Sequence, residues 1–350
     1  MLQSWQGPCQ LDENAYVKTM ITTRSYGHLP DGSVVNAYDI QSADGFMVTI
    51  LSYGATLQSL TIPDGTDIVL GFDDLAGYLG EHPYFGAVIG RVANRIRGAR
   101  FEIDGKYYDL PTNEGENNLH SGPNGFDRVN WKAEIKDETL ILRHTSPDGH
   151  QGFPGEVKAE LRFRFKGYTL SLEMSASTDK ATPLNMTYHP YFNLTDGGAS
   201  SCQDHMLEIN ANFYEVKDHQ NLPTGEIKQL ASSPHDYRDA RAIDNGAEYL
   251  DQNFIRTLPG KTGMFKQAKL WSNTTGHKVI ICSTQPCLQA YTGRHISRIT
   301  GKGGVSYGPN HGIALEPQGF IHEPKILRPG ESYQHKISYT FRRRANEASK

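Results

Sequence analysis

Cysteine is scarce in this 350-residue sequence, and its scarcity excludes some classes of protein. The four cysteines are Cys9, Cys202, Cys282 and Cys287. So few and so scattered thiols do not form the framework of a disulfide-rich secreted domain. We therefore expect all four to be free and reduced, as is usual in the cytoplasm.

Long apolar runs and an excess of positive charge are also missing. The first residues have neither the basic start nor the apolar segment of a signal peptide, and no later run reaches membrane-spanning length. The net charge of −4 comes from interspersed acids and bases, so no basic stripe can neutralise nucleic-acid phosphates. These absences predict a cytoplasmic protein without membrane or nucleic-acid partners, whose ligand is neutral or small.

Helical periodicity is scarce, whereas strand-like alternation is frequent. The nearest approach to an amphipathic helix, residues 73–86, contains glycines and a proline that keep it short. Residues 157–165 alternate Val, Ala, Leu and Phe with Lys, Glu and Arg, which is typical of a strand with one buried face. Lys166-Gly167 and Asp104-Gly105 then predict tight hairpin turns. The chain is therefore predicted to be all-β, folded as a large antiparallel β-sandwich.

No internal repeat and no low-complexity linker divides the chain. Further strand-like runs, among them residues 47–62 and 205–216, continue almost to the C-terminus. The two ends lack this pattern and are expected to fray. We expect a single β-sandwich domain at residues 21–342, an N-terminal arm at residues 1–20 and a polar C-terminal tail at residues 343–350.

Four short segments combine titratable side chains with Gly or Pro, which is how a β scaffold presents a site from its loops and strand ends. They are GRVANRI (90–96), NNLHSGPNGFD (117–127), NMTYHPYFNL (185–194) and IALEPQGF (313–320). Pro190 removes a backbone donor, so we expect His189 to lie at an edge or at the end of a strand, facing a cleft. Glu316 ends an apolar run, and a carboxylate at the end of a buried strand carries a desolvation cost that suggests a function.

Each of these residues also has an ordinary interpretation when it is taken alone. Arg91 and Arg95 suit surface charges on a bend, His120 suits a loop residue that caps backbone groups, and His189 suits a hydrogen-bonded strand histidine. HxH, HExxH and CxxC patterns are absent, and the GKGG segment lacks the context of a phosphate loop. We therefore expect no metal and no cofactor. What remains is a histidine and a carboxylate acting as acid and base, with hydrogen-bond donors for a neutral ligand.

The segments resemble, in their order, the galactose mutarotase (aldose 1-epimerase) family. The resemblance also includes SYGATLQSLTIPD, DQNF, TQPCLQAYTG and LRPGESY, and it covers nearly the whole chain apart from its two ends. It implies a large β-sandwich enzyme that interconverts the α and β anomers of free aldoses such as D-galactose or D-glucose, without metal or cofactor. It leaves a monomer and a homodimer open. A non-catalytic sugar-binding or sensing protein is the alternative, and a relative acting on hexose 6-phosphates would call for an Arg or Lys cluster at the pocket rim.

The resemblance also implies roles for individual residues. His189 falls on the catalytic acid and Glu316 on the catalytic base, and the sugar-binding positions fall on Asn94, Arg95, His120, Asp251 and Gln289. Ring opening would require a charged His189 and an ionised Glu316 together near neutral pH, each favouring the charge of the other. The residues that flank this pair depart from common family patterns, so the preferred sugar stays open among galactose, glucose, xylose and arabinose.

Overall fold

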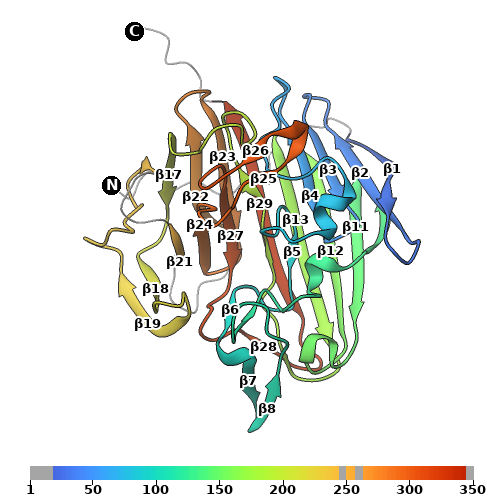
Figure 1. The fold of residues 1–350 in the computed structure, drawn as a ribbon, viewed down its shortest axis with the longest axis vertical. Helices are drawn as coiled ribbons and strands as arrows, with labels where there is room; N and C mark the ends of the chain where they lie inside the picture. Colours follow the sequence, from blue (N-terminus) through green and yellow to red (C-terminus); the bar gives the residue numbers. More distant parts are fainter. Residues whose placement is uncertain (1–18, 244–249, 257–262, 344–350) are drawn as a thin grey trace.

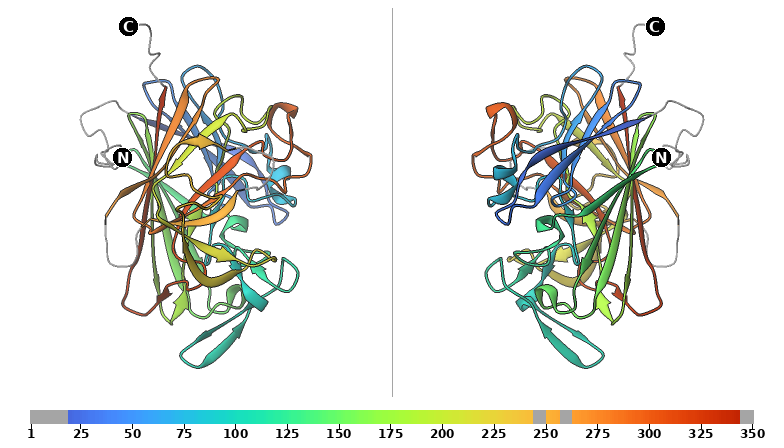
Figure 2. Two further views of the ribbon diagram at one scale, coloured as in Figure 1. Left: turned by 90° about the vertical axis from the view of Figure 1, so that its left-hand side faces the viewer. Right: turned by 90° about the vertical axis from the view of Figure 1, so that its right-hand side faces the viewer.

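The computed structural model describes residues 19–243, 250–256 and 263–343, and this part of the chain folds as a β-sandwich (Figures 1 and 2). One layer is a nine-stranded antiparallel sheet. In spatial order, its strands are β10 (Lys132–Lys136), β11 (Thr139–Ser146), β12 (Val157–Lys166), β13 (Thr169–Thr178), β29 (Tyr333–Arg343), β23 (His277–Ser283), β22 (Phe265–Ser272), β17 (His205–Ile209) and β20 (Arg241–Ala242).

Two smaller antiparallel sheets complete the sandwich. One is formed by β1 (Met20–His28), β2 (Val34–Gln41), β3 (Met47–Leu51) and β4 (Leu57–Thr61). The other is formed, in spatial order, by β16 (Tyr191–Phe192), β27 (Ile313–Gln318), β24 (Cys287–Tyr291), β21 (Asp251–Ile255), β18 (Phe213–Lys217) and β19 (Pro223–Gln229). In Figure 1 the first lies at the upper right and the second at the left.

Short ladders and turns connect the three sheets. The two-stranded ladders are β5 (Val88–Ile89) with β15 (Thr187–Tyr188), β6 (Arg95–Ile96) with β9 (Asn118–Leu119), β7 (Arg100–Ile103) with β8 (Lys106–Asp109), β14 (Thr182–Pro183) with β28 (Ile326–Leu327), and β25 (Ile299–Thr300) with β26 (Ser306–Tyr307). The helical segments are α1 (Leu75–Leu79), η2 (Arg97–Ala99), η3 (Phe126–Arg128), η4 (His150–Gly152) and η5 (Lys302–Gly304). The prediction that residues 73–86 form at most a short helix is confirmed by α1.

The main hydrophobic core contains side chains from all three sheets, among them Ile50, Phe163 and Leu315. Alternation along β12 places five side chains in this core, whereas Lys158, Arg162 and Arg164 are exposed on the other face. Burying each large apolar side chain contributes about 1.5–3 kcal/mol, and the one-residue alternation fixes which face receives it. The predicted all-β sandwich is therefore confirmed.

Both predicted hairpins are present. In the β12–β13 hairpin Phe163 pairs with Leu172, and the chain turns at Gly167, whose φ of 55° lies in the left-handed region. In the β7–β8 hairpin Asp104 and Gly105 have φ values of 51° and 79°, as a tight primed turn requires. The runs at residues 47–62 and 205–216 are each broken into two strands, β3 and β4 in the first and β17 and β18 in the second.

The expectation of four reduced cysteines is wrong for Cys282. Cys202 and Cys287 are free and buried, but Cys282 is disulfide-bonded. Separation along the sequence does not limit which residues a large sandwich brings together, so spacing was a poor guide at Cys282. Cys9 lies outside the described residues.

The ends of the expected domain fall close to the ends of the described region. The strands run from Met20 to Arg343, and most of the expected arm and tail lie outside the described residues. The division of the chain into arm, domain and tail therefore stays a prediction. Among the described residues, no helix has the length and apolar character needed to cross a membrane.

Candidate active site

The six-stranded sheet has one apolar and one polar face. Leu288, Ala290 and Leu315 belong to the main core, and the residues between them in the two strands point to the opposite face. There Glu316 on β27 pairs with Gln289 on β24, and Asn253 on β21 pairs with Gln289 from the other side. The strand register therefore collects carboxylates and amides on one buried surface, and the segments around residues 84–95, 117–127 and 187–193 pack near it.

His189 lies between two short strands, β15 and β16. Its amide donates to the Ala87 carbonyl (3.0 Å), and its carbonyl accepts from the Gly86 amide (3.0 Å). Pro190 follows and the ladder stops there, which confirms the expected strand end. The backbone is thus fixed on both sides, so the imidazole has a defined position over the polar face of the six-stranded sheet.

His189 and Glu316 meet directly. The His189 Nε2 atom lies 3.4 Å from Glu316 Oε1, and the two side chains are only 4% and 2% exposed. The remaining polar atoms of the pair, His189 Nδ1 and Glu316 Oε2, are buried and have no hydrogen-bond partner among the described residues. Buried polar atoms are almost always satisfied, so these two atoms are suited to bind a polar ligand.

Burial alters the pKa of both groups. It lowers the pKa of His189 to about 4, although Asp251 opposes the shift. Burial also raises the pKa of Glu316 well above its usual value; Asp251 adds to this increase, and Lys217 opposes it. Desolvation therefore disfavours the charged form of both groups, contrary to the expectation that each group keeps the other charged near neutral pH.

Asn94 and His120 hold each other in place. The Asn94 amide donates to His120 Nδ1 (3.1 Å), and the His120 amide donates to the Asn94 carbonyl (3.1 Å). Both residues have positive φ values, 71° and 53°, which is uncommon for residues other than glycine and is often found at functional sites. Burial lowers the pKa of His120, so the neutral ring accepts at Nδ1 and presents its N–H at Nε2.

A chain of hydrogen bonds links three of the predicted sugar-binding residues across the sheet. Asn94 Nδ2 donates to Gln289 Oε1 (3.3 Å), and Gln289 Nε2 donates to Asp251 Oδ1 (2.6 Å). Arg95 forms a bidentate pair with Glu114, through Nε to Oε2 (2.6 Å) and Nη2 to Oε1 (2.7 Å). Arg95, the second arginine of GRVANRI, is therefore held in a fixed orientation by a carboxylate.

The structure thus brings the predicted residues to one place, and it adds some that the sequence did not indicate. His120 and His189 pack edge to face with ring centroids 5.6 Å apart, and Tyr84 and Tyr191 flank them with centroids 4.6 Å from His120 and 5.0 Å from His189. Glu114 and Lys217, which hold Arg95 and Asp251, were missed as well. The alternation in FYEVK (213–217) could have indicated that Lys217 lies on the same face of the strand as Glu215. It could not have indicated that this face is buried.

Glu316 does not end its strand. Strand β27 continues through Pro317 to Gln318, so the expected strand end at Glu316 is wrong. Proline is tolerated because β16 pairs only with Ile313 and Ala314, which leaves the later part of β27 without a strand on that side.

Arg91, the first arginine of GRVANRI, is not a surface charge. It is 1% exposed, and its guanidinium donates to the Ser146 hydroxyl (2.9 Å), the Pro147 carbonyl (2.9 Å) and the Pro154 carbonyl (2.9 Å). Burial lowers its pKa to about 10. Arg91 therefore ties together loops that would otherwise leave carbonyl groups unsatisfied, and it stands apart from the His189 and Glu316 pair.

Replacing Arg91 should destabilise the fold. We expect Arg91→Met to lower the free energy of unfolding by about 3–5 kcal/mol, since several buried acceptors lose their donors at once. Urea denaturation followed by circular dichroism measures the change. Arg162→Met removes an exposed arginine that pairs with Glu160, and it should change stability by less than about 1 kcal/mol. Equal stabilities of the two variants would contradict a structural role for Arg91.

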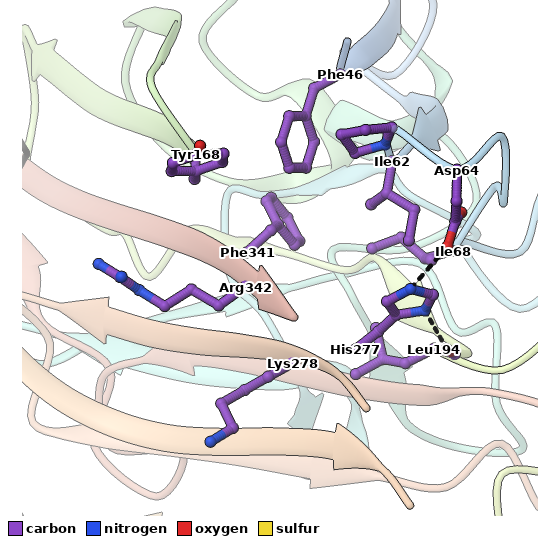
Figure 3. Close-up of a pocket in the computed structure, with 11 residues that line it drawn as sticks. Phe46, Ile62, Asp64, Ile68, Tyr168, Leu194, His277, Lys278, Phe341 and Arg342 are labelled. Atoms are coloured by element: carbon purple, nitrogen blue, oxygen red, sulfur yellow. Dashed lines mark hydrogen bonds and ion pairs between the residues drawn. The ribbon is translucent and has the colours of Figure 1, made fainter. Parts of the chain in front are cut away.

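A cavity of about 580 Å³ lies elsewhere in the sandwich (Figure 3). It is lined by Phe46, Ile62, Pro63, Asp64, Ile68, Tyr168, Leu194, His277, Lys278, Phe341 and Arg342, none of which is a predicted site residue. Its histidine, His277, is bound by Asp64 at 2.9 Å and by the Leu194 carbonyl at 3.1 Å, as the dashed lines show. This cavity therefore lacks the unsatisfied acid and base of the His189 site.

Comparison with known proteins gives a consistent result. The family model described as aldose 1-epimerase matches residues 36–340. Galactose mutarotase from Homo sapiens is 36% identical over 92% of this chain and 98% of its own, and aldose 1-epimerase from Escherichia coli is 33% identical over 89% and 96%.

Solved structures agree with these relatives. The GalM/aldose epimerase homologue from C. elegans has a TM-score of 0.80 at 30% identity, over 87% of this chain and 97% of that one. Galactose 1-epimerase from Lactobacillus acidophilus also has a TM-score of 0.80, at 26% identity over 94% and 100%. Since the match in sequence and in structure extends over most of the chain, this protein belongs to the aldose 1-epimerase family.

Proposed function

We propose that Glu316 and His189 interconvert the α and β anomers of a free aldose in this enzyme, with Glu316 as the base and His189 as the acid. The observation that carries the proposal is the 3.4 Å approach of His189 Nε2 to Glu316 Oε1 at a buried site. The C1 hydroxyl and the ring oxygen are bonded to the same carbon of a cyclic aldose. Groups that exchange protons with both must therefore lie next to each other.

The reaction opens and recloses the ring. Glu316 takes the proton of the C1 hydroxyl while His189 gives one to the ring oxygen, so the bond between C1 and the ring oxygen breaks and an open-chain aldehyde forms. Rotation about the C1–C2 bond turns the carbonyl, and reclosure with the roles of the two groups reversed gives the other anomer. Protons are conserved over the cycle, and no covalent intermediate with the protein is required.

The pKa directions are compatible with this cycle. A protonated Glu316 with a neutral His189 holds the same single proton as an ionised Glu316 with an imidazolium, and the two states differ only by a transfer between neighbouring atoms. Sugar hydroxyls that donate to Glu316 and accept from His189 would replace lost hydration and favour the charged pair. Substrate binding therefore prepares the acid and the base that ring opening needs.

The remaining predicted residues bind the sugar in this proposal. Arg95 and His120 donate, and Asp251 accepts from a pair of hydroxyls. Asn94 and Gln289, besides lying at the sugar, also hold Asp251 through their hydrogen-bond chain. Neutral hydroxyls suit such a set, because the Arg95 charge is already paired with Glu114. A free monosaccharide therefore fits better than a hexose phosphate. The named relatives are mutarotases and epimerases, so the non-catalytic alternative finds no support.

Polarimetry tests the proposal. Freshly dissolved α-D-galactose should reach its equilibrium rotation faster with the protein than in buffer alone, and α-D-glucose, xylose and arabinose in the same assay rank the substrates. Galactose comes first because the human relative is named for it. A time course that no aldose of the panel changes would overturn the proposal.

The cytoplasmic location follows from the sequence expectation and is proposed on that ground alone.

A further inference from the structure

Lys217 is a buried ammonium group beside the proposed sugar site. It is the last residue of β18, and its side chain is only 3% exposed. Its Nζ donates to Asp251 Oδ1 at 2.7 Å and to the Asp251 carbonyl at 3.1 Å. Strand β18 pairs with β21, so Lys217 approaches Asp251 along the polar face of the six-stranded sheet. Two bonds to the same residue hold the carboxylate and its backbone together.

Stability alone is a weak reason for such a pair. Bringing two charges out of water costs several kcal/mol for each ion, and apolar residues of similar size often serve a fold equally well. The pair does, however, orient a group that binds ligand in the proposed function. Asp251 Oδ1 accepts from both Lys217 and Gln289, and within the described residues no hydrogen bond reaches Oδ2. Oδ2 is therefore the atom left to accept sugar hydroxyls.

We propose that Lys217 is a positioning residue for anomer interconversion: it aims Asp251 at the sugar and balances the negative charge that Asp251 places near Glu316. The inference rests on the proposed function and adds a residue to it. Without the ammonium group, two buried carboxylates would share one site, and like charges that are close together resist simultaneous ionisation.

The surrounding charges support this balance. Burial raises the pKa of Asp251, but Lys217, Arg95 and the Gln289 bond together outweigh it, so the pKa lies below its usual value. Glu316 faces His189 and Asp251. The rings of Tyr191 and Tyr339 lie near enough for its charge to raise their pKa values. The field of Lys217 also reaches His120.

A set of variants separates orientation from charge. We expect Lys217→Met to lower kcat/KM for galactose about 10- to 100-fold, mainly through KM, since a hydrogen bond to a charged group is lost. In the pH profile of kcat/KM, the acidic limb should move to higher pH by on the order of one unit, because the negative charge of Asp251 is no longer balanced by the ammonium group of Lys217. Lys217→Arg keeps the charge, so its limb should stay near that of the wild type.

Removing Asp251 should have the opposite effect on the limb. Asp251→Asn leaves the ammonium unbalanced and should move the acidic limb to lower pH, whereas Lys217→Met with Asp251→Asn should restore it to near the wild-type position. A residue with a merely structural role would not shift the two single variants in opposite directions. Lys269→Met is the matched control, because Lys269 forms a partly buried pair with Glu208 (2.9 Å) in the nine-stranded sheet. Its rate and its limb should be unchanged.

The outcomes distinguish the two proposals. A wild-type protein that does not accelerate mutarotation contradicts the proposed function. If the wild type is active but the acidic limb of Lys217→Met is the same as that of the wild type, only the proposed role of Lys217 is contradicted. If Lys217→Met does not fold, the double variant, which has no unbalanced charge, is compared with Asp251→Asn. Coinciding limbs in that comparison would likewise overturn the inference.

Discussion

Glu316→Gln should reduce kcat/KM for the preferred aldose about a hundred- to ten-thousand-fold, which is the usual contribution of general acid–base assistance. Glutamine keeps the shape of the side chain and cannot accept a proton as a carboxylate does. The loss should appear in kcat more than in KM, since the base acts while the ring bond breaks. Polarimetry over a range of galactose concentrations measures both parameters.

The fold should tolerate the Glu316→Gln change. Glu316 is 2% exposed at its side chain, and its Oε2 has no hydrogen-bond partner among the described residues. A neutral amide of the same size removes the cost of ionising this carboxyl in a buried place. Glu160→Gln, on the solvent-facing side of β12, is the matched control and should keep full activity. Full activity in Glu316→Gln as well would show that another group is the base.

The same substitution carries a pH signature in stability. The pKa of Glu316 is raised on folding, so its protonated form favours the native state. This contribution to stability is complete below the pKa of the carboxyl in the unfolded chain, near 4.5, and it is lost as the pH rises through the pKa in the folded protein. Glu316→Gln does not titrate, so its stability relative to the wild type should increase with pH above about 4.5. Urea midpoints at several pH values test this sign.

The sequence predicted the architecture because its signals are local. Alternation from Val157 to Phe165 determines which side chains enter the core, and Asp104-Gly105 closes its hairpin with the backbone angles that this dipeptide favours. The fracture of residues 47–62 into β3 and β4 was not foreseen, since a turn at Gly54 interrupts an otherwise strand-like run.

Only part of the candidate site was predicted from the sequence. Local sequence features indicated His189 and Glu316, and the family resemblance implied their roles. Their separation of 3.4 Å, however, depends on the register of β27 against β24 and on the short β15 ladder. Lys217 gave no comparable signal, because a lysine at the end of a polar strand is normally solvated. Likewise, the sign of the pKa shifts follows from burial, which a sequence does not show. Arg91 was interpreted as a surface charge when it was taken alone, but it is fully buried. This interpretation failed because the sequence does not show burial.

His189→Asn should also lose most of the activity, because the ring oxygen then lacks its proton donor. We expect a fall in kcat of about a hundred- to ten-thousand-fold. The matched control is His277→Asn. His277 is likewise a buried histidine bound to a carboxylate, Asp64, but it lines the separate cavity of Figure 3. Retained activity in His277→Asn, alongside its loss in His189→Asn, would show that position and not burial of a histidine matters.

Combining the two catalytic substitutions gives the strictest test of the pair. An acid and a base that act in one step are removed as a unit, so the second substitution should add little to the loss caused by the first. We expect the activity of Glu316→Gln with His189→Asn to fall close to that of either single variant. Multiplication of the two losses would instead indicate independent contributions, as expected for residues that lie far apart. The 3.4 Å contact predicts the first result, because a proton that one group accepts must be matched by a proton that the other delivers.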